Sequence, residues 1–242
     1  MPDITIRNLI KIYKTGRTEV LALRELRLDV LSGEMITILG PSGCGKSTLL
    51  NMIAGLDRPN AGSIVVDGHN IVELGESELA RYRRTGVGVV FQFFNLVPTL
   101  TARENIELPM RLHGTGPSLR NRRTGELLEL VKMAERAEHR PEELSGGEQQ
   151  RIAIAVALAN DPPLILADEP TGELDSKTGR EVLEIFRTMK VKQGKTLLIV
   201  THDERIAKLS DRTVRMMDGQ IVDDRANAAS PADGVMHAVK GT

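Results

Sequence analysis

The feature that most constrains the fold of this chain is a glycine-rich turn between an apolar segment and a helical one. Residues 34–39 predict a buried strand that ends at Gly40, and residues 47–54 predict a helix that Gly55 closes. The intervening turn reads Gly40-Pro41-Ser42-Gly43-Cys44-Gly45-Lys46-Ser47, which fits the pattern of glycine, any four residues, and then Gly-Lys-Ser. Strand, turn and helix in this order predict a loop that binds phosphate.

Each residue type in this turn has a chemical reason. Glycines let backbone N–H groups turn inward around phosphate oxygens, and the helix N-terminus adds the positive end of a dipole. We expect Lys46 to reach the β- and γ-phosphates of a nucleotide, the Ser47 hydroxyl to bind Mg²⁺, and Cys44 to fill space. The predicted phosphate-binding residues are Gly40, Pro41, Ser42, Gly43, Cys44, Gly45, Lys46, Ser47 and Thr48.

Two adjacent carboxylates follow a second apolar strand. Residues 164–167 predict this strand, and Asp168 and Glu169 stand at its C-terminal end, the edge at which open α/β sheets bind ligands. We expect Asp168 to hold the Mg²⁺ shell and Glu169 to polarise an attacking water. An Asp-Glu pair after an apolar run is common, so this interpretation depends on the phosphate loop in the same chain.

A Ser-Gly-Gly sequence opens a further predicted helix. Ser145, Gly146 and Gly147 precede Glu148, and the free amides of such a helix start form a second anion site. By itself the segment would be an ordinary loop and helix cap. Its combination with the phosphate loop and the paired carboxylates favours the anion site.

Strand and helix signals alternate along the chain. Strands are predicted, besides residues 34–39, at residues 4–6, 26–31, 63–66, 87–91, 164–167 and 196–200. Helices are predicted from Thr101, with Pro109 kinking or ending the helix, over about residues 119–137, and after Gly147. A further helix carries an apolar core stripe formed by Val182, Ile185, Phe186 and Met189. The alternation predicts an α/β fold with a mostly parallel sheet, a helical insertion over about residues 95–160, and a weakly ordered tail at 226–242.

Composition excludes several other classes of protein. The 242 residues include 32 Lys and Arg against 33 Asp and Glu, and this balance disfavours a general nucleic-acid coat. The single cysteine excludes an internal disulfide. The longest apolar run, residues 152–159, is far shorter than the roughly 18–20 residues that cross a bilayer. Any membrane role is therefore expected to be peripheral, through a partner.

Taken together, the three motifs resemble those of the nucleotide-binding subunit of ATP-binding cassette (ABC) transporters, over about residues 3–225. The resemblance implies a P-loop NTPase fold with a RecA-like sheet, an N-terminal antiparallel β subdomain and an inserted α-helical subdomain. It implies one nucleotide-binding domain over residues 1–225 that binds ATP and Mg²⁺ and hydrolyses ATP. It also implies a homodimer formed with ATP, separate transmembrane permease subunits, no nucleic-acid partner, and a peripheral place at the cytoplasmic face of the inner membrane.

The resemblance carries further site residues onto this sequence. Glu169, His202, Gln92 and Lys46 are implied to be catalytic, and Ser47, Gln92 and Asp168 to bind Mg²⁺. Tyr13 is implied to stack on adenine, although a lone tyrosine is often only packing. Asp175 is implied to lie in a loop that meets the opposite subunit, and Ser145, Gly146, Gly147 and Glu148 to contact the ATP of that subunit.

Finer features are similar to the lipoprotein-release and macrolide-export branch of the family. They lie at residues 55–59, 90–96, 104–109 and 144–151. Two positions depart from that pattern, Val156 where arginine is expected and Glu173 where asparagine is expected. We also predict that Phe93, Phe94 and Leu96 line an apolar groove beside Gln92 that receives a helix of the membrane subunit; the alternative is that they are core.

Two other functions compete with a transporter subunit that powers export, lipoprotein release or mechanical work across a membrane. One is an ABC-type ATPase acting on DNA or ribosomes, but the chain has neither a sustained heptad run nor a second phosphate loop. The other is a phosphate-loop kinase or GTPase, which would not need Ser145-Gly146-Gly147 or His202.

Overall fold

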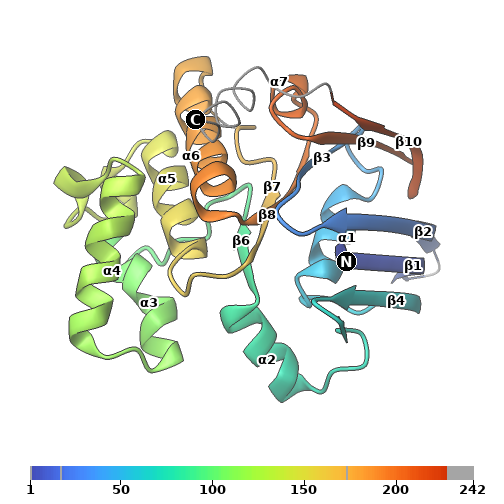
Figure 1. Ribbon diagram of the computed structural model, residues 1–242, viewed down its shortest axis with the longest axis horizontal. Helices are drawn as coiled ribbons and strands as arrows, with labels where there is room; N and C mark the ends of the chain where they lie inside the picture. The colour runs from blue at the N-terminus through green and yellow to red at the C-terminus, as the bar shows by residue number, and fades with distance from the viewer. Residues whose placement is uncertain (1, 17, 173, 228–242) are drawn as a thin grey trace, which may run out of the picture.

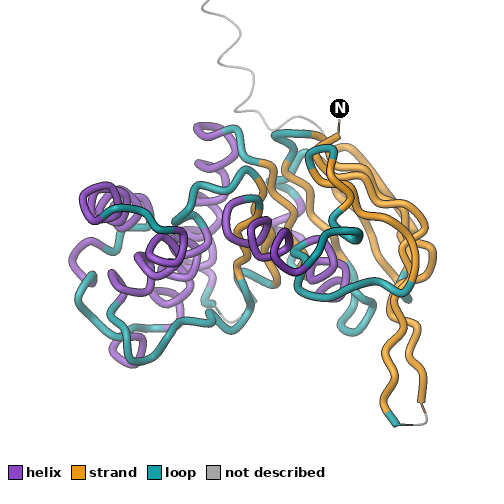
Figure 2. The backbone as a smooth tube through the Cα atoms, turned by 90° about the horizontal axis from the view of Figure 1, so that it is seen from below, coloured by secondary structure: helices purple, strands orange, loops and turns teal. Residues whose placement is uncertain are grey.

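The computed structural model describes residues 2–16, 18–172 and 174–227, which form two sheets and a group of helices (Figure 1). The smaller sheet is antiparallel, with the strand order β2-β1-β4-β5. Its strands are β1 (Pro2–Thr15), β2 (Thr18–Leu31), β4 (Ala61–Val66) and β5 (His69–Asn70). Strands β1 and β2 form a long hairpin whose end extends beyond the body of the molecule (Figure 2).

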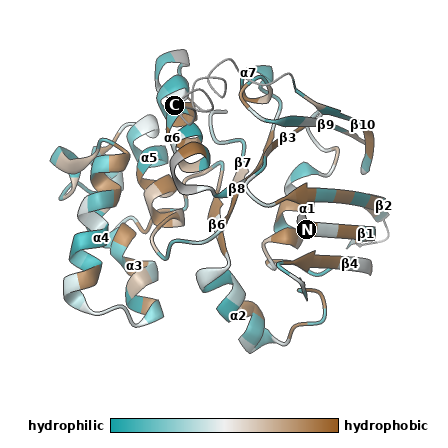
Figure 3. Ribbon diagram, viewed as in Figure 1, coloured by the Kyte–Doolittle hydropathy of each residue, from teal (hydrophilic) through white to brown (hydrophobic). Residues whose placement is uncertain are grey.

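The larger sheet has the strand order β10-β9-β3-β8-β7-β6, and every pairing in it is parallel except that of β9 with β10. Its strands are β3 (Met35–Leu39), β6 (Val87–Val90), β7 (Leu164–Asp168), β8 (Thr196–Thr201), β9 (Arg212–Met217) and β10 (Gln220–Ala226). Strands β3 and β8 are buried along their whole length, as expected for a parallel sheet covered on both faces, and the central strands are largely hydrophobic (Figure 3). The predicted α/β fold with an antiparallel subdomain is confirmed.

Helix α1 (Lys46–Ile53) joins the two sheets. Its Leu49 and Leu50 share a core cluster with Ile6 of β1 and Ile38 of β3. The other helices of this part of the chain are α2 (Glu76–Thr85), α6 (Ser176–Gln193) and α7 (Glu204–Ala207). Helix α6 buries the predicted stripe in the second core cluster, which confirms that the stripe is core: Val182, Ile185, Phe186 and Met189.

Three helices come between β6 and β7, although these two strands are neighbours in the sheet. They are α3 (Ala102–His113), α4 (Pro117–Leu130) and α5 (Gly146–Ala157), and short 3₁₀ turns at Ala134–Arg136 and Pro141–Glu143 lead into α5. The segment is therefore an insertion into the sheet, and it leaves β6 and β7 free to pair.

At Pro109 the helix does not end, and one predicted helix end, that of α4, differs from the structure. Helix α3 continues through Pro109 to His113, since burial of Ile106 and Met110 outweighs the loss of one backbone hydrogen bond. Helix α4 ends at Leu130 rather than near residue 137, because Lys132 adopts a left-handed φ of 57° that no helix continues.

No helix within the described ranges is long and apolar enough to cross a membrane. Strand β10 ends at Ala226, where the tail was predicted to begin, and residues 228–242 lie outside the described residues.

Candidate active site

The glycine-rich turn connects the C-terminal end of β3 to α1 and is closely packed against other backbone. A side chain at Gly40 would clash with the carbonyl oxygen of Met216, and one at Gly45, where φ is 103°, would lie 2.5 Å from the carbonyl oxygen of Ala22. The Gly219 N–H also donates to the Cys44 carbonyl at 3.0 Å. Glycine is therefore required at both positions, and the turn is held from outside by the β9–β10 connection.

The Lys46 side chain lies folded over its own turn. It is 6% exposed, and its Nζ donates to the carbonyl oxygens of Gly40 at 2.7 Å and Pro41 at 3.1 Å. The nearest carboxylate oxygen is Oε1 of Glu169, at 3.9 Å. A buried ammonium that forms no close ion pair within the described residues attracts an anion. The Cys44 side chain is buried among the α1 core residues, which agrees with a space-filling role.

The Asp168 carboxylate lies at the end of β7, and one of its oxygens has no hydrogen-bond partner. Burial raises the pKa of Asp168, and the charge of Glu169 adds to this effect, while a hydrogen bond from the Ser47 hydroxyl and the charge of Lys46 oppose it. Its Oδ1 is buried and accepts no hydrogen bond. No group of three His, Cys, Asp or Glu side chains able to hold a metal occurs within the described ranges. An unpartnered carboxylate oxygen beside a hydroxyl nevertheless fits Mg²⁺, which usually takes one or two protein oxygens and completes its shell with phosphate and water.

Glu169 adopts an unusual backbone conformation, with φ at 44°. Its N–H donates to the Val200 carbonyl at 2.9 Å, and its side chain, 13% exposed, turns toward the end of β8. There Oε2 accepts from Thr201 Oγ1 at 2.8 Å, lies 3.3 Å from His202 N and is 3.0 Å from His202 Nδ1. The carboxylate is thus fixed at the sheet edge with Oε1 facing the phosphate-loop lysine.

Of the two other residues predicted at this edge, His202 contacts Glu169 and Gln92 does not. His202 reaches Glu169 through Nδ1, and its side chain is 68% exposed. Gln92 follows the end of β6, the neighbour of β7, but its side chain has no hydrogen bond to Asp168 or Glu169. Thr201 was missed by sequence reasoning, although it lies in the same strand end as His202.

The Ser145–Glu148 segment begins α5 and satisfies its own polar groups. The Ser145 N–H and hydroxyl donate to Glu148 Oε2 at 2.8 and 2.7 Å, and these hydrogen bonds hold the pKa of the Glu148 carboxyl below its usual range. A side chain at Gly147 would clash with Thr178 of α6. Within the described part of the chain, no hydrogen bond or ion pair joins this segment to residues 40–48.

Tyr13 interacts with Thr48 in the first turn of α1 and with Asp57, which follows the end of that helix. Its Oη donates to Asp57 Oδ2 at 2.9 Å, and Nζ of Lys11, bound to Asp57 Oδ1 at 2.8 Å, lies 4.8 Å from the ring centroid. Burial and the hydrogen bond to Asp57 raise the pKa of Tyr13, and a hydrogen bond with the Thr48 hydroxyl opposes them. The tyrosine therefore lies beside the phosphate-loop helix, with its side chain 37% exposed.

Asp175 accepts hydrogen bonds from the N–H groups of Lys177 and Thr178 at 2.9 and 3.2 Å, so it is the N-cap of α6. Its carboxylate remains on the surface. The neighbouring Glu173 lies outside the described residues.

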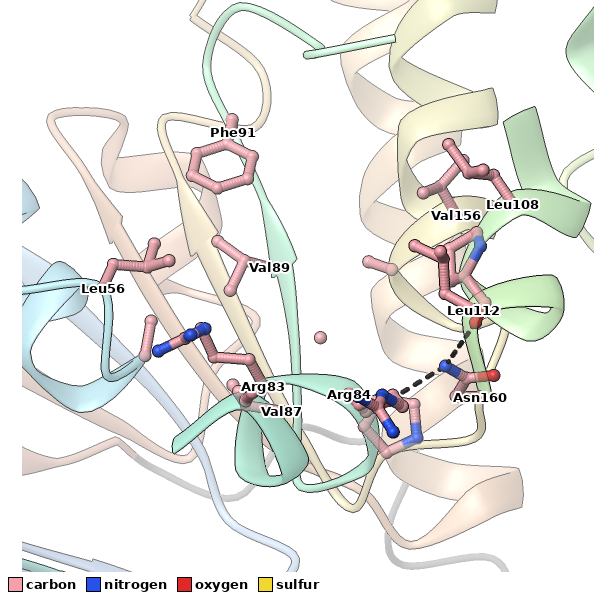
Figure 4. Close-up of a pocket in the computed structure, with 16 residues that line it drawn as sticks. Leu56, Arg83, Arg84, Val87, Val89, Phe91, Leu108, Leu112, Val156 and Asn160 are labelled. Carbon is pink, nitrogen blue, oxygen red and sulfur yellow. Dashed lines mark hydrogen bonds between the residues drawn. The ribbon is translucent and has the colours of Figure 1, made fainter. Parts of the chain in front are cut away.

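An apolar groove of about 500 Å³ separates the sheet from the helical insertion (Figure 4). Leu56, Val89 and Phe91 line one side, and Leu108, Leu112 and Val156 line the other. Asn160 crosses between the two parts, since its Nδ2 donates to the carbonyls of Arg84 and Pro109 at 2.9 and 3.2 Å.

The three residues predicted to line a docking groove beside Gln92 do not line this groove. Phe93 is 74% exposed, Leu96 packs against the core, and the Phe94 ring lies near Gly146, so none of the three lines the groove. Phe91 does so instead. The departure at Val156 lies in this groove, where its apolar side chain extends the apolar lining.

A phosphate-binding turn after a buried strand, a carboxylate pair on the next-but-one strand and a helical insertion that opens with Ser-Gly-Gly define a nucleotide-binding ATPase cassette. A family model described as ABC transporter matches residues 23–172. The chain belongs to this family, as an ATP-binding subunit.

Curated relatives and solved structures support the same family assignment. An uncharacterized ABC transporter ATP-binding protein of Thermotoga maritima is 51% identical over 87% of this chain and 90% of its own. The macrolide export ATP-binding/permease protein MacB of Brucella abortus is 44% identical over 92% of this chain and 34% of its own. A dimeric structure of a post-hydrolysis state of the ATP-binding cassette MJ0796, a protein of Methanocaldococcus jannaschii, bound to ADP and Pi, superposes with a TM-score of 0.88 at 41% identity, over 94% of this chain and 100% of that chain.

Proposed function

We propose that this subunit hydrolyses ATP and drives export, lipoprotein release or mechanical work through a separate permease in the membrane. The observation that carries the catalytic part is the fixed Glu169 carboxylate, whose Oε1 faces the buried Lys46 ammonium at 3.9 Å. The two side chains face the same edge of the sheet, so a γ-phosphate bound by Lys46 would lie within reach of a water held by Glu169.

The phosphate loop holds the nucleotide. The backbone N–H groups of residues 42–48 surround the phosphates, and Lys46 leaves its loop carbonyls to bind the β- and γ-phosphates. Ser47, whose hydroxyl opposes the rise that burial causes in the pKa of Asp168, and Asp168 itself would hold Mg²⁺, with Gln92 as a third ligand. The ion would supply positive charge that stabilises the phosphate oxygens in the transition state.

The chemistry at the γ-phosphate is assigned to the sheet edge. Glu169 accepts the hydrogen bond of the water and orients it for attack, and His202, whose exposed ring already touches Glu169, contacts the γ-phosphate. Tyr13 would stack on the adenine ring.

Assembly is proposed to complete the site. Among the described residues, no hydrogen bond or ion pair joins the Ser145–Glu148 segment to its own phosphate loop, and a relative forms a dimer. Two copies placed head to tail would bring each segment to the ATP of the other. Amides that contact the γ-phosphate favour ATP over ADP, so hydrolysis would loosen the pair.

The groove between sheet and insertion is proposed to receive the permease. It is apolar, it lies beside Gln92, and MacB, a relative in the export branch, bears the name of an ATP-binding/permease protein. The subunit would then work on the cytoplasmic face of the inner membrane, held there by this contact.

The test is capture of the tagged Glu169→Gln chain from detergent-solubilised membranes with ATP and Mg²⁺. We expect a polytopic membrane protein in the eluate, in amounts comparable to the chain. Ribosomes or nuclease-sensitive nucleic acid in its place would contradict the permease and favour an ABC-type ATPase that acts on DNA or ribosomes.

A further inference from the structure

Thr201 is the last residue of β8 and is fully buried. Strand β8 runs parallel to β7 and pairs Val200 with Asp168, so the residues that end the two strands meet at one edge of the sheet. Here the Thr201 hydroxyl lies 2.8 Å from Oε2 of Glu169. No motif discussed above gives this threonine a role.

The direction of this hydrogen bond is determined by a second one. The Asp203 N–H donates to Thr201 Oγ1 at 3.0 Å, which occupies an acceptor position of the hydroxyl. Because Glu169 is an acceptor when ionised, the Thr201 hydroxyl must be the donor to it. Hydrogen bonds from a neutral donor to an ionised acceptor are among the stronger ones, and a buried hydroxyl has no water to replace the carboxylate.

The other contacts of Glu169 are less permanent. The His202 ring is 68% exposed and is proposed to turn to the γ-phosphate when ATP is bound. The His202 N–H lies 3.3 Å from Oε2, a longer contact than that of Thr201. Once the histidine ring leaves, the Thr201 hydroxyl is the short side-chain contact that still fixes Oε2 and keeps Oε1 toward Lys46.

We propose that Thr201 is a positioning residue for hydrolysis, which holds the Glu169 carboxylate in the direction of the attacking water. This inference rests on the proposed catalytic role of Glu169. Thr201 contacts neither nucleotide nor metal in this scheme, so its loss would slow the chemical step and leave ATP affinity unchanged.

The test replaces threonine by valine, which has nearly the same shape and lacks the hydroxyl. For Thr201→Val we expect kcat of the purified chain to fall at least about tenfold, with KM for ATP within about twofold of the wild-type value. Thr201→Ser keeps the hydroxyl and should restore kcat to within about threefold of wild type.

The chain offers a matched control in the neighbouring strand. Thr37 of β3 is equally buried, and its hydroxyl has no hydrogen-bond partner. Thr37→Val makes the same atomic change without removing a hydrogen bond, so it should leave kcat within about twofold of wild type. Equal losses in the two valine variants would overturn the inference, because they would reflect strand packing alone.

A double-mutant cycle separates this inference from the proposed function. In single turnovers, Thr201→Val should add less than about a twofold loss in a Glu169→Gln background, because the residue acts through Glu169. If Glu169→Gln itself keeps wild-type turnover, the proposed catalytic assignment fails. If Glu169→Gln is inactive and folded Thr201→Val keeps wild-type kcat, only the positioning role fails. Should the valine variant not fold, Thr201→Ala replaces it under the same two criteria.

Discussion

The two turns of this molecule that we propose to bind anions begin helices in similar ways, yet their surroundings differ. The turn at residues 40–47 is enclosed: its lysine is buried, Asp168 and Glu169 stand beside it, and other backbone packs against its glycines. The turn at residues 145–148 is partly exposed; Ser145 and Glu148 cap each other, and Glu148 also forms an ion pair with Arg136. The first turn thus has a cation, a carboxylate pair and a hydroxyl within one chain, whereas the second offers the backbone of a helix start and is proposed to act on a ligand bound by another subunit.

The largest effect is expected at the enclosed site. Glu169→Gln keeps the shape and the contact to Thr201 but removes the base, so turnover should fall by at least about a hundredfold while ATP binding stays intact. The measurement is steady-state ATPase activity together with equilibrium binding of ATP. A variant that keeps more than about a tenth of kcat, a change below roughly 1.4 kcal/mol in activation free energy, would remove Glu169 from the catalytic role.

The exposed turn should control assembly instead of chemistry. Gly146→Asp places a carboxylate against the phosphate, and there is room for it, since the nearest atom to an added Cβ is 3.7 Å away on Phe94. In a Glu169→Gln background with ATP and Mg²⁺, sedimentation should show a dimer that Gly146→Asp abolishes. Without nucleotide both variants should be monomers or weak dimers.

Mixing two chains sharpens this comparison, because each then supplies one turn. A Lys46→Ala chain and a Gly146→Asp chain, both with Glu169→Gln, should form a dimer with one intact site, made from the phosphate loop of the second chain and the Ser145-Gly146-Gly147 of the first. If the Gly146→Asp, Glu169→Gln chain dimerises as well alone as Glu169→Gln does, the composite site is wrong. Gly147 is unsuitable for this test, since any side chain there clashes with Thr178.

A substitution in the groove should weaken association with the permease without changing ATP hydrolysis or ATP-dependent dimerisation. Leu112 of α3 lines the groove and is 70% exposed, so Leu112→Asp should leave folding and basal ATPase activity within about twofold of wild type. It should reduce association with the permease by at least tenfold, roughly 1.4 kcal/mol. The matched control is Leu119→Asp in α4, since Leu119 is 51% exposed and lies outside this groove. Equal loss in both variants would mean that the groove is not the docking surface.

The two turns also mark how far the sequence predicts the structure. Local patterns placed the phosphate loop, the carboxylates at the end of β7 and the start of α5, because each depends on residues next to one another in the chain. The Thr201–Glu169 contact depends on which strand neighbours β7, which periodicity does not specify. Sequence patterns did not predict the lining of this groove, because its residues come from β6, α3 and α5, which lie far apart in the chain.

The smallest effect is expected at Tyr13, where the ring and the hydroxyl have separable roles. The hydroxyl binds Asp57 at the far end of α1, while the ring face opposite Lys11 is the surface proposed for adenine. Tyr13→Ala removes both and should raise KM for ATP about fivefold, corresponding to the lower end of the roughly 1–3 kcal/mol that stacking of a base provides. Tyr13→Phe keeps the ring and should raise KM less than about twofold, and neither variant should change kcat, since the tyrosine is distant from the γ-phosphate in this scheme. Equal increases in the two variants would assign the effect to the Asp57 hydrogen bond, and an unchanged KM in Tyr13→Ala would mean that the residue is only packing.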